Sequence, residues 1–306
     1  MKGQVTSLYD PALGRILLGP DGAVIPTPAT VTGGVGEGVA YAVANRWAFK
    51  CLPHETIACS GMLTVPSCSY ADIDLGSTDF SFSAACNAPG LYLNSYNGGR
   101  FKHTGRLIYS GTGTCGMYIA PATPDPVHNQ KIIQNAELEF GYVWINGVSI
   151  GQGVVIDLSQ GSIMNNRLGW LNVNGWDGAH NRMSQGIYVI PSANPYIGFN
   201  ENMIRVGQMQ GFSQTGIVIT ADPSVTAGDN EWDAMLNTTG MPGEQPSSMV
   251  DTCASYDEWR LSMTIFTGSC AHGIVFNAGA NHNSYKIRQD TSNNGTRDNG
   301  MGNKAI

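Results

Sequence analysis

The sequence has few charged residues. Only 13% of its 306 residues are Asp, Glu, Lys or Arg, whereas soluble domains usually carry about a quarter. The net charge is −7 and no basic stripe stands out, so a nucleic-acid partner is not expected. The same balance argues mildly against a strongly anionic polysaccharide as ligand. Glycine is abundant instead, with 39 residues, and this composition suits short strands joined by tight turns.

The sequence also lacks any run of about 18 apolar residues, so we predict no membrane insertion. The first residues, Met1–Thr6, do not contain the continuous apolar stretch of a signal peptide. We therefore expect synthesis in the cytoplasm, or a chain that has been trimmed.

Several motifs of well-defined chemistry are missing. The sequence contains no Gly-x-Ser-x-Gly, no Walker A loop, no His-Glu-x-x-His and no Asp-rich calcium loop. The six histidines are scattered singly, and no Cys-x-x-Cys pair or Cys/His cluster has zinc spacing. We therefore predict neither a cofactor nor a bound metal.

The cysteine count is seven, so at least one thiol is unpaired unless it bonds another chain. Cys86, Cys115 and Cys270 each stand shortly before a short glycine-led strand. We interpret these three as small buried residues. Redox chemistry or a crosslink between subunits is the alternative.

A glycine followed by a short alternating apolar strand recurs along the chain. The copies are Gly90-Leu91-Tyr92-Leu93, Gly116-Met117-Tyr118-Ile119, Gly153-Val154-Val155-Ile156, Gly186-Ile187-Tyr188-Val189, Gly216-Ile217-Val218-Ile219 and Gly273-Ile274-Val275-Phe276, with a degenerate copy at Ser248-Met249-Val250. Their first apolar residues are 26, 37, 33, 30, 32 and 25 positions apart. A drifting period of this kind indicates one structural unit stacked repeatedly along an axis.

A second phrase, Asn or Asp followed by apolar residues, runs in step with the first. It occurs at Asn165-Asn166-Arg167-Leu168, Asn202-Met203-Ile204, Asn230-Glu231-Trp232, Asp257-Glu258-Trp259 and Asn283-Ser284-Tyr285. The strands are too short and too β-branched for helical repeats. Together the two phrases predict an all-β solenoid.

The start of the repeat has its own pattern. The spacing of apolar residues predicts a helix over 38–50, with Val39, Val43 and Trp47 on one face. Short alternating segments then predict strands at Thr56–Cys59, Gly61–Ser67, Ala71–Gly76 and Phe80–Phe82.

This order resembles the entry to pectate-lyase-like right-handed parallel β-helices, especially those of bacteriophage tailspikes. The resemblance implies a right-handed parallel β-helix, in which a helix at Val39–Lys50 caps the first coil. It also implies that Gly61–Ser67 and Asp74-Leu75-Gly76 form the first rungs. The exposed apolar side faces of such a solenoid predict a homotrimer.

Three regions follow from this interpretation. Residues 1–34 do not share the repeat and are expected to form an N-terminal arm or attachment segment. Residues 35–290 form the capped β-helix. Residues 291–306 form a polar tail, either frayed or exchanged with neighbouring subunits.

The segment 169–182 has the composition of a glycan-contact loop. The residues that we expect to bind a ligand there are Trp170, Trp176, Asp177, His180 and Arg182. Aromatic faces stack on sugar rings, and the polar groups can hydrogen-bond hydroxyls. The alternative is a pair of tryptophans packed over the coil.

Carboxylates beside the second phrase are candidates for glycoside hydrolysis, which needs one protonated and one ionised carboxyl about 5 Å or about 6.5–9.5 Å apart. The candidates are Glu201, Glu231 and Glu258, with Asp233 and Asp257 beside them. If the three glutamates stack in one column, at least one pKa rises. The alternative is a solvated ladder of surface carboxylates.

Function is expected to follow the tailspike resemblance. The protein would be a phage virion surface protein, made in the host cytoplasm, whose arm contacts other virion proteins. Its β-helix would recognise a bacterial surface polysaccharide, and cleavage of that polysaccharide is left open. The alternatives are a non-enzymatic capsid or tail decoration protein and a free polysaccharide hydrolase or lyase.

Overall fold

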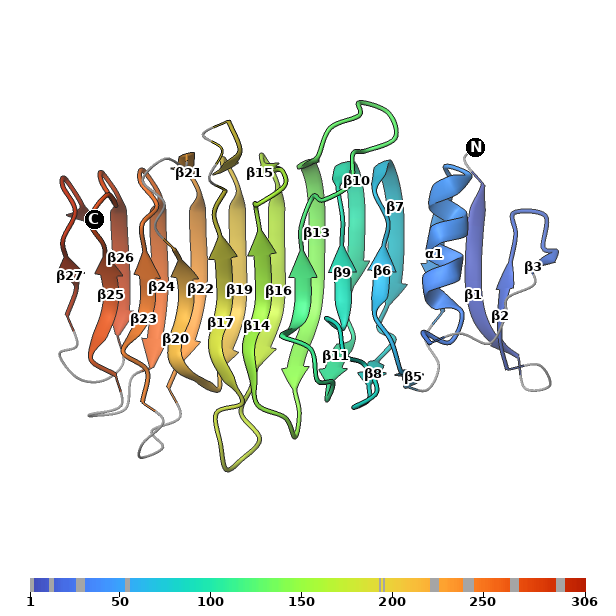
Figure 1. Ribbon diagram of the computed structural model, residues 1–306, viewed down its shortest axis with the longest axis horizontal. Coiled ribbons are helices and arrows are strands. Elements are labelled where there is room, and N and C mark those ends of the chain that lie inside the picture. Colours follow the sequence, from blue (N-terminus) through green and yellow to red (C-terminus); the bar gives the residue numbers. More distant parts are fainter. Residues whose placement is uncertain are drawn as a thin grey trace.

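The computed structural model is an all-β structure with long sheets of parallel strands, an arrangement consistent with a β-helix. It describes residues 3–10, 14–25, 31–52, 56–192, 194, 196–220, 226–238, 245–264, 270–289 and 295–306. Within these ranges there is one helix, α1 (Val35–Ala44). Figure 1 shows the strands stacked side by side along the long axis, with the chain running from one end to the other.

One sheet has nine parallel strands, one from each successive turn of the chain. In stacking order they are β6 (Leu63–Val65), β9 (Leu91–Leu93), β12 (Cys115–Ile119), β14 (Ile150–Asp157), β17 (Met183–Ile190), β20 (Phe212–Ile219), β23 (Ser248–Thr252), β25 (His272–Phe276) and β27 (Arg297–Asp298). The copies of the glycine-led phrase coincide with the seven strands from β9 to β25.

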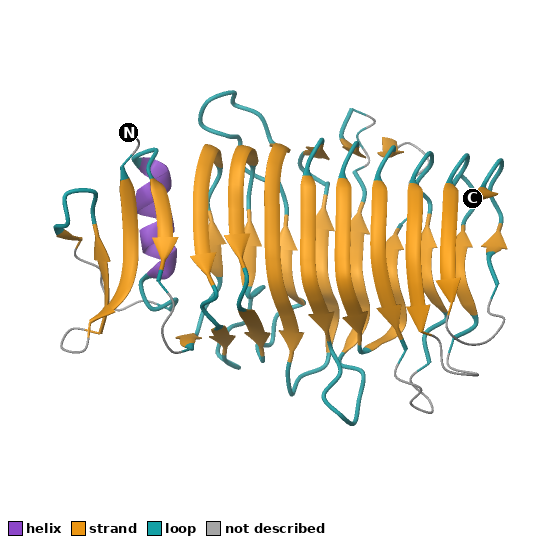
Figure 2. Cartoon of the chain, turned by 180° about the vertical axis from the view of Figure 1, so that it is seen from behind, coloured by secondary structure: helices purple, strands orange, loops and turns teal. Residues whose placement is uncertain are grey.

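A second, longer ladder of strands contains the Asn/Asp phrase. In stacking order it consists of β1 (Gln4–Asp10), β4 (Ala48–Cys51), β7 (Cys68–Gly76), β10 (Tyr96–His103), β13 (Ile132–Ile145), β16 (Arg167–Asn174), β19 (Met203–Gln210), β22 (Glu231–Asn237), β24 (Glu258–Thr264), β26 (Ser284–Gln289) and β28 (Lys304–Ala305). Figure 2 shows this ladder from behind as a broad row of parallel strands.

Two sets of short strands extend the long ladder, one set following its strands along the chain and the other preceding them. Within each set, strands of neighbouring turns pair with each other. They are β5 (Ile57–Cys59), β8 (Phe80–Phe82) and β11 (Arg106–Tyr109) after it, and β15 (Ser162–Met164), β18 (Gly198–Asn200) and β21 (Thr226–Gly228) before it. The four strands predicted between residues 56 and 82 correspond to β5, β6, β7 and β8.

The predicted vertical register is confirmed. Ile187 and Ile217 are Cα partners on neighbouring strands, and the same column runs through the other copies of the phrase. The degenerate copy is shifted by one residue, because Val250, not Met249, pairs with Ile217 and Ile274.

The repeated glycine is required by close packing. A Cβ on Gly186 would lie 2.1 Å from the Met209 sulfur and 2.7 Å from the carbonyl oxygen of Gly216. The backbone of one turn therefore passes against core side chains of the facing sheet, and only glycine leaves room.

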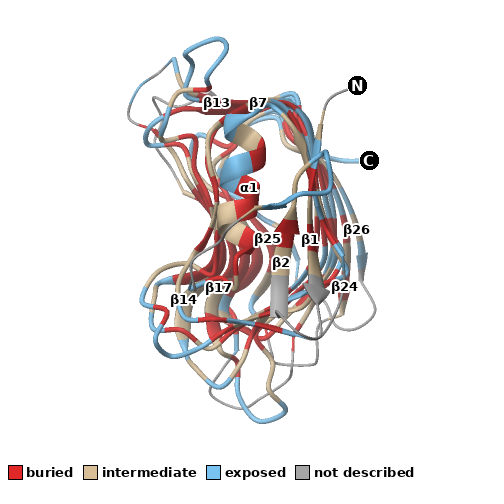
Figure 3. Cartoon of the chain, turned by 90° about the vertical axis from the view of Figure 1, so that its right-hand side faces the viewer, coloured by how far each residue is buried: buried red, intermediate tan, exposed pale blue. Residues whose placement is uncertain are grey.

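Buried residues, red in Figure 3, occur in both sheets, and one hydrophobic core cluster extends from Val5 to Ala280. Large side chains stack on equivalent ones in the next turn, as ladders of like residues do in parallel sheets. Trp232 and Trp259 stack with centroids 5.0 Å apart and planes 6° apart, and Phe140 stacks on Trp170 at 5.3 Å.

The helix is shorter than predicted. It follows Gly34, whose φ is 86°, and it ends at Ala44. Arg46 then has a left-handed φ of 56°, and the N–H of Trp47 donates to the Ala42 carbonyl at 2.8 Å. The prediction of helix through Lys50 is wrong, because this left-handed residue ends the helix and the next residues pair as β4.

The described part of the N-terminal segment is folded onto the chain itself. β1 pairs in parallel with β4, and β2 (Gly14–Leu18) and β3 (Val24–Ile25) extend it as antiparallel strands. Val5 and Leu17 are buried, and α1 contacts β1, β4 and β6. Residues 1–2, 11–13 and 26–30 of the predicted arm lie outside the described residues, and its role in attachment stays a prediction.

The C-terminal segment also continues the stack. β27 pairs with β25, and β28 pairs with β26. Residues 290–294 lie outside the described residues, but 295–306 pair with the preceding turn. The exchange of this segment with neighbouring subunits stays a prediction.

The seven cysteines are thiols, and Cys86, Cys115 and Cys270 are buried, as the sequence predicted. Burial raises the pKa of the Cys59 and Cys115 thiols to about 12, so these two remain protonated near neutral pH.

Candidate functional site

A ladder of buried amides runs along the corner before the long sheet. The Asn166 side chain donates to Asn202 Oδ1 at 3.0 Å, and Asn202 donates in turn to Asn230 Oδ1 at 3.0 Å. The ladder continues through Asp257 and Asn283 to Asn303. Each amide hydrogen-bonds to backbone groups of the adjacent turn. The Asn/Asp phrase therefore marks residues that hold successive turns together.

Asp257 is the one carboxylate in this ladder. Its Oδ1 accepts hydrogen bonds from the Asn230 backbone N–H at 2.9 Å and the Asn230 side chain at 3.1 Å, and its Oδ2 accepts one from Trp232 Nε1 at 3.1 Å. Burial raises the pKa of Asp257 to about 7, despite these hydrogen bonds. A predicted catalytic residue is thus placed inside the core, with no surface for a substrate to contact.

The residue before each ladder position has a left-handed backbone. Glu201 and Asp229 are two of these, each with φ 57°, and the Glu201 N–H donates to the Asp229 carbonyl. Glu201 is exposed at this corner, beside a hollow of about 490 Å³ that also contains Arg167.

The three glutamates do not form one column, which corrects the sequence prediction. Glu231 and Glu258 are Cα partners, but the residue that pairs with Glu231 on the preceding strand is Met203, two positions after Glu201. Glu201 precedes its ladder residue, Asn202, whereas Glu231 and Glu258 follow theirs, Asn230 and Asp257.

Arg260 joins the two glutamates that do stack. Its guanidinium lies 2.6 Å from Glu231 Oε1 and 2.7 Å from Glu258 Oε1. Glu258 is one turn from Glu231, about 4.8 Å in a parallel sheet, which approaches the spacing of a retaining hydrolase. The shared guanidinium occupies the space between the carboxylates and compensates their repulsion.

Outward side chains of the long sheet form a column in which charge alternates. In stacking order it contains Lys102, Glu139, Gly169, Arg205, Asp233, Arg260 and Lys286. From Lys102 to Arg260 the sign alternates except at Gly169, where no side chain stands. A Cβ added at Gly169 would meet nothing within 4 Å.

This gap is part of a surface hollow of about 600 Å³. On one side stands Glu139, which accepts a hydrogen bond from Arg100 at 3.0 Å. On the other side Arg205 lies 3.9 Å from Asp233, and its side chain is 73% exposed. Exposed Leu171 and Met235 add apolar surface. The hollow therefore combines an apolar floor with both donors and acceptors at its rim.

His103 lies at the end of this hollow and is buried. Its Nε2 donates to the Thr78 carbonyl at 2.7 Å, and its Nδ1 has no partner among the described residues. Burial lowers the pKa of the imidazole, although the Thr78 bond opposes this shift. The sequence analysis did not single out His103, which is one of six scattered histidines.

The predicted glycan-contact residues are divided between core and surface. Trp170 borders the hollow but is only 2% exposed, and its Nε1 lies 3.4 Å from the Met117 sulfur. Since 167–174 is strand β16, the loop begins only at Gly175. The structure thus places Trp170 in the packed core, while Trp176 lies in the loop that follows the strand.

The remaining four residues form a small hairpin in which Trp176 pairs with Asn181. Asp177 Oδ1 accepts the N–H groups of Ala179 and His180, and Asp177 Oδ2 lies 2.6 Å from Arg182 Nε. These hydrogen bonds, the Ala179 N–H first, lower the pKa of Asp177 to about 2. Asp177 and Arg182 stabilise the turn with the same groups that a glycan would need.

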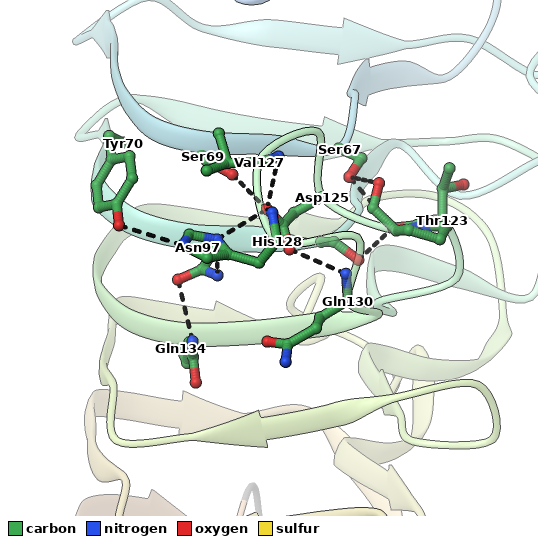
Figure 4. A network of polar contacts seen from close by, with 12 residues as sticks. Ser67, Ser69, Tyr70, Asn97, Thr123, Asp125, Val127, His128, Gln130 and Gln134 are labelled. Carbon is green, nitrogen blue, oxygen red and sulfur yellow. Dashed lines mark hydrogen bonds and ion pairs between the residues drawn. The ribbon is translucent and has the colours of Figure 1, made fainter.

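A polar network that the sequence analysis missed surrounds Asp125 (Figure 4). Its buried carboxylate accepts hydrogen bonds from Ser69 Oγ at 2.6 Å and from the N–H groups of Val127, His128 and Gln130. Burial alone would raise the pKa of Asp125, but these hydrogen bonds hold it well below its usual value. No spacing rule links Ser69 with Asp125, because the contact joins separate turns.

In the part of the chain that the structure describes, no three His, Cys, Asp or Glu side chains are arranged to hold a metal ion. In the same part, no helix has the length and apolarity needed to cross a membrane. Comparison of the chain with protein families, curated proteins and solved structures finds no match.

Proposed function

We propose that the protein binds a bacterial surface polysaccharide in the hollow around Gly169. The observation that carries this proposal is the missing side chain in an otherwise charged column, which opens about 600 Å³ between Glu139 and Arg205. The Arg205 guanidinium supplies N–H donors, and the carboxylates of Glu139 and Asp233 supply acceptors. A sugar hydroxyl can therefore either accept or donate a hydrogen bond in the hollow. Leu171 offers an apolar surface for the C–H face of a sugar.

Binding is better supported than cleavage. Asp257 is enclosed in the amide ladder, and Arg260 holds both Glu231 and Glu258. A general acid and a nucleophile each need an oxygen free to face the substrate. The catalytic roles of these residues stay predictions.

The finer sequence predictions remain part of this proposal. Right-handed winding, a capping role for α1, a virion location and attachment through the N-terminal segment are carried by the tailspike resemblance. A homotrimer is supported by a column on the outer face of the nine-stranded sheet that contains half-buried Tyr92, Tyr118 and Tyr188, with buried Val155 between the last two. Sedimentation velocity tests the trimer, which Tyr118→Arg would weaken if this face is the interface.

The binding proposal is tested by filling the hollow. Gly169→Leu places a side chain in open space and blocks the site without disturbing the fold. Gly295→Leu is the matched control, because a Cβ there also meets nothing within 4 Å. Binding of purified bacterial surface polysaccharides, measured by biolayer interferometry, should weaken at least tenfold in Gly169→Leu only. Equal binding by all three proteins would disprove the proposal.

A further inference from the structure

Another cleft, of about 560 Å³, lies between the end of α1, the start of β7 and the loop before β13. Its wall on the helix side contains Val43, Arg46 and Trp47, and its opposite wall contains Tyr70, Asp72 and Val127. The volume falls in the range of about 300–1,000 Å³ that is typical of small-molecule sites.

The cleft has a rigid frame. Arg46 lies in the turn after α1 and Tyr70 lies within β7, and both have a left-handed φ of 56°. Asp125 anchors Val127 by accepting its N–H at 3.0 Å, and the Ser69 hydroxyl binds the same carboxylate (Figure 4). The wall that contains Tyr70 and Val127 is therefore held together by a buried carboxylate, and it is formed before any ligand arrives.

The chemistry of the lining is that of a sugar subsite. The Tyr70 side chain is exposed, and its ring lies against Gly98, where a Cβ would be 2.9 Å from Cδ1. Tyr70 OH is 3.4 Å from His128 Nε2, which fixes the ring (Figure 4). Aromatic and valine surfaces suit the C–H face of a ring, which makes this wall complementary to a pyranose.

Charge selects among sugars. Arg46 and Asp72 line the cleft with opposite signs, and neither forms an ion pair within the described residues. Opposite charges leave no net attraction for an ion, but they offer one set of donors and one set of acceptors to hydroxyls.

We propose that this cleft binds one neutral pyranose unit, as a subsite separate from the hollow around Gly169. The proposal rests on the proposed function, because it assigns a sugar class to a glycan-binding protein. Tyr70 supplies the ring platform, Arg46 donates to hydroxyl oxygens, and Asp72 accepts from hydroxyl protons.

The test compares binding of neutral methyl pyranosides and of hexuronates by saturation-transfer NMR and titration. Tyr70→Asn removes the ring while keeping a residue that tolerates the left-handed backbone. Tyr256→Asn is the matched control, because Tyr256 is also exposed, has a φ of 62° and packs on a histidine. We expect Tyr70→Asn to weaken binding of a neutral pyranoside at least tenfold and Tyr256→Asn to leave it unchanged.

Three outcomes would overturn the proposal. They are equal affinity of wild type and Tyr70→Asn, preference for hexuronates over neutral pyranosides, and no pyranoside binding by the wild type. With any of these three outcomes, the proposed function would still stand if wild type binds a polysaccharide and Gly169→Leu does not. Only the pyranose subsite would then be disproved. If wild type binds no polysaccharide either, both proposals fail.

Discussion

Trp232 and Trp259 occupy equivalent positions and stack with their planes 6° apart, but their indole N–H groups differ. Trp232 Nε1 donates to Asp257 Oδ2 at 3.1 Å, whereas Trp259 Nε1 has no acceptor among the described residues. The residue equivalent to Asp257 in the next turn is Asn283, whose side-chain nitrogen donates to the Ala254 carbonyl and to Asn303. A carboxylate in the ladder can accept from tryptophan, and an asparagine in the same orientation cannot.

This difference predicts a pH dependence of stability. The pKa of Asp257 is raised from 3.8 to about 7 by burial. Between these two values the folded state binds more protons than the unfolded state, so the free energy of unfolding falls as pH rises and levels off above about 7. The shift corresponds to a loss on the order of 4 kcal/mol.

The measurement is urea unfolding from pH 4 to pH 8 for wild type and Asp257→Asn. The difference between the two proteins separates Asp257 from other titrating groups, including His103, whose lowered pKa acts in the opposite direction. We expect the wild type to lose stability relative to Asp257→Asn as pH rises. Parallel curves for the two proteins would contradict the assignment.

The amide ladder predicts a large effect from one buried side chain. Asn202 donates to Ile163 O and Asn230 Oδ1, both at 3.0 Å, and accepts from Asn166. Asn202→Ala leaves these buried groups unsatisfied and should lower the free energy of unfolding by about 2–3 kcal/mol. Asn165→Gly is the control, because Asn165 is exposed and has a φ of 55°, which glycine tolerates. Similar unfolding midpoints for the two variants would argue against the ladder.

The Arg260 bridge predicts a salt-dependent loss. Arg260→Ala leaves Glu231 and Glu258 as adjacent partners of like charge. Because Arg260 is exposed to solvent, the loss of stability should be small and should shrink as salt is added. Unfolding midpoints at low and high salt measure this effect. Arg205→Ala, whose contact with Asp233 is 3.9 Å long, should change neither midpoint; a salt-independent loss in Arg260→Ala would point to packing instead.

The packing of α1 predicts a steric effect. A Cβ on Gly38 would lie 2.6 Å from a Phe49 ring carbon and 2.8 Å from Leu17 Cδ2. Gly38→Ala should therefore destabilise the protein by about 1–3 kcal/mol, although alanine is the better helix former. Thermal unfolding measures the change. A higher melting temperature for Gly38→Ala would show that α1 packs less closely than the structure indicates.

Hydrolysis can be tested separately from binding. We expect wild type to release no reducing ends from polysaccharides that it binds, because Asp257 is buried and Arg260 holds both stacked glutamates. Release that disappears in Glu231→Gln or Glu258→Gln, but persists in Glu201→Gln, would instead assign the stacked pair to catalysis.

The sequence predicted the repeat well and the candidate site poorly. Ile187 over Ile217 followed from the spacing of glycine-led strands, because inward residues must recur once per turn. The sequence did not reveal that the three glutamates fail to form one column. Glu201 lies two residues before Met203, the partner of Glu231, and therefore falls at the left-handed corner and not on the strand. The Asp125 network was invisible, because Ser69 and Asp125 are 56 residues apart.

The sequence by itself determined that this chain forms stacked short strands, because the period of its glycine and asparagine phrases is a local property that every turn repeats. Only the tertiary structure decided where the surface opens. The hollow exists because Gly169 falls in an outward column between Glu139 and Arg205, and that neighbourhood depends on the register of three turns. The same register decided that Asp257 is enclosed while Glu231 and Glu258 face solvent beside Arg260.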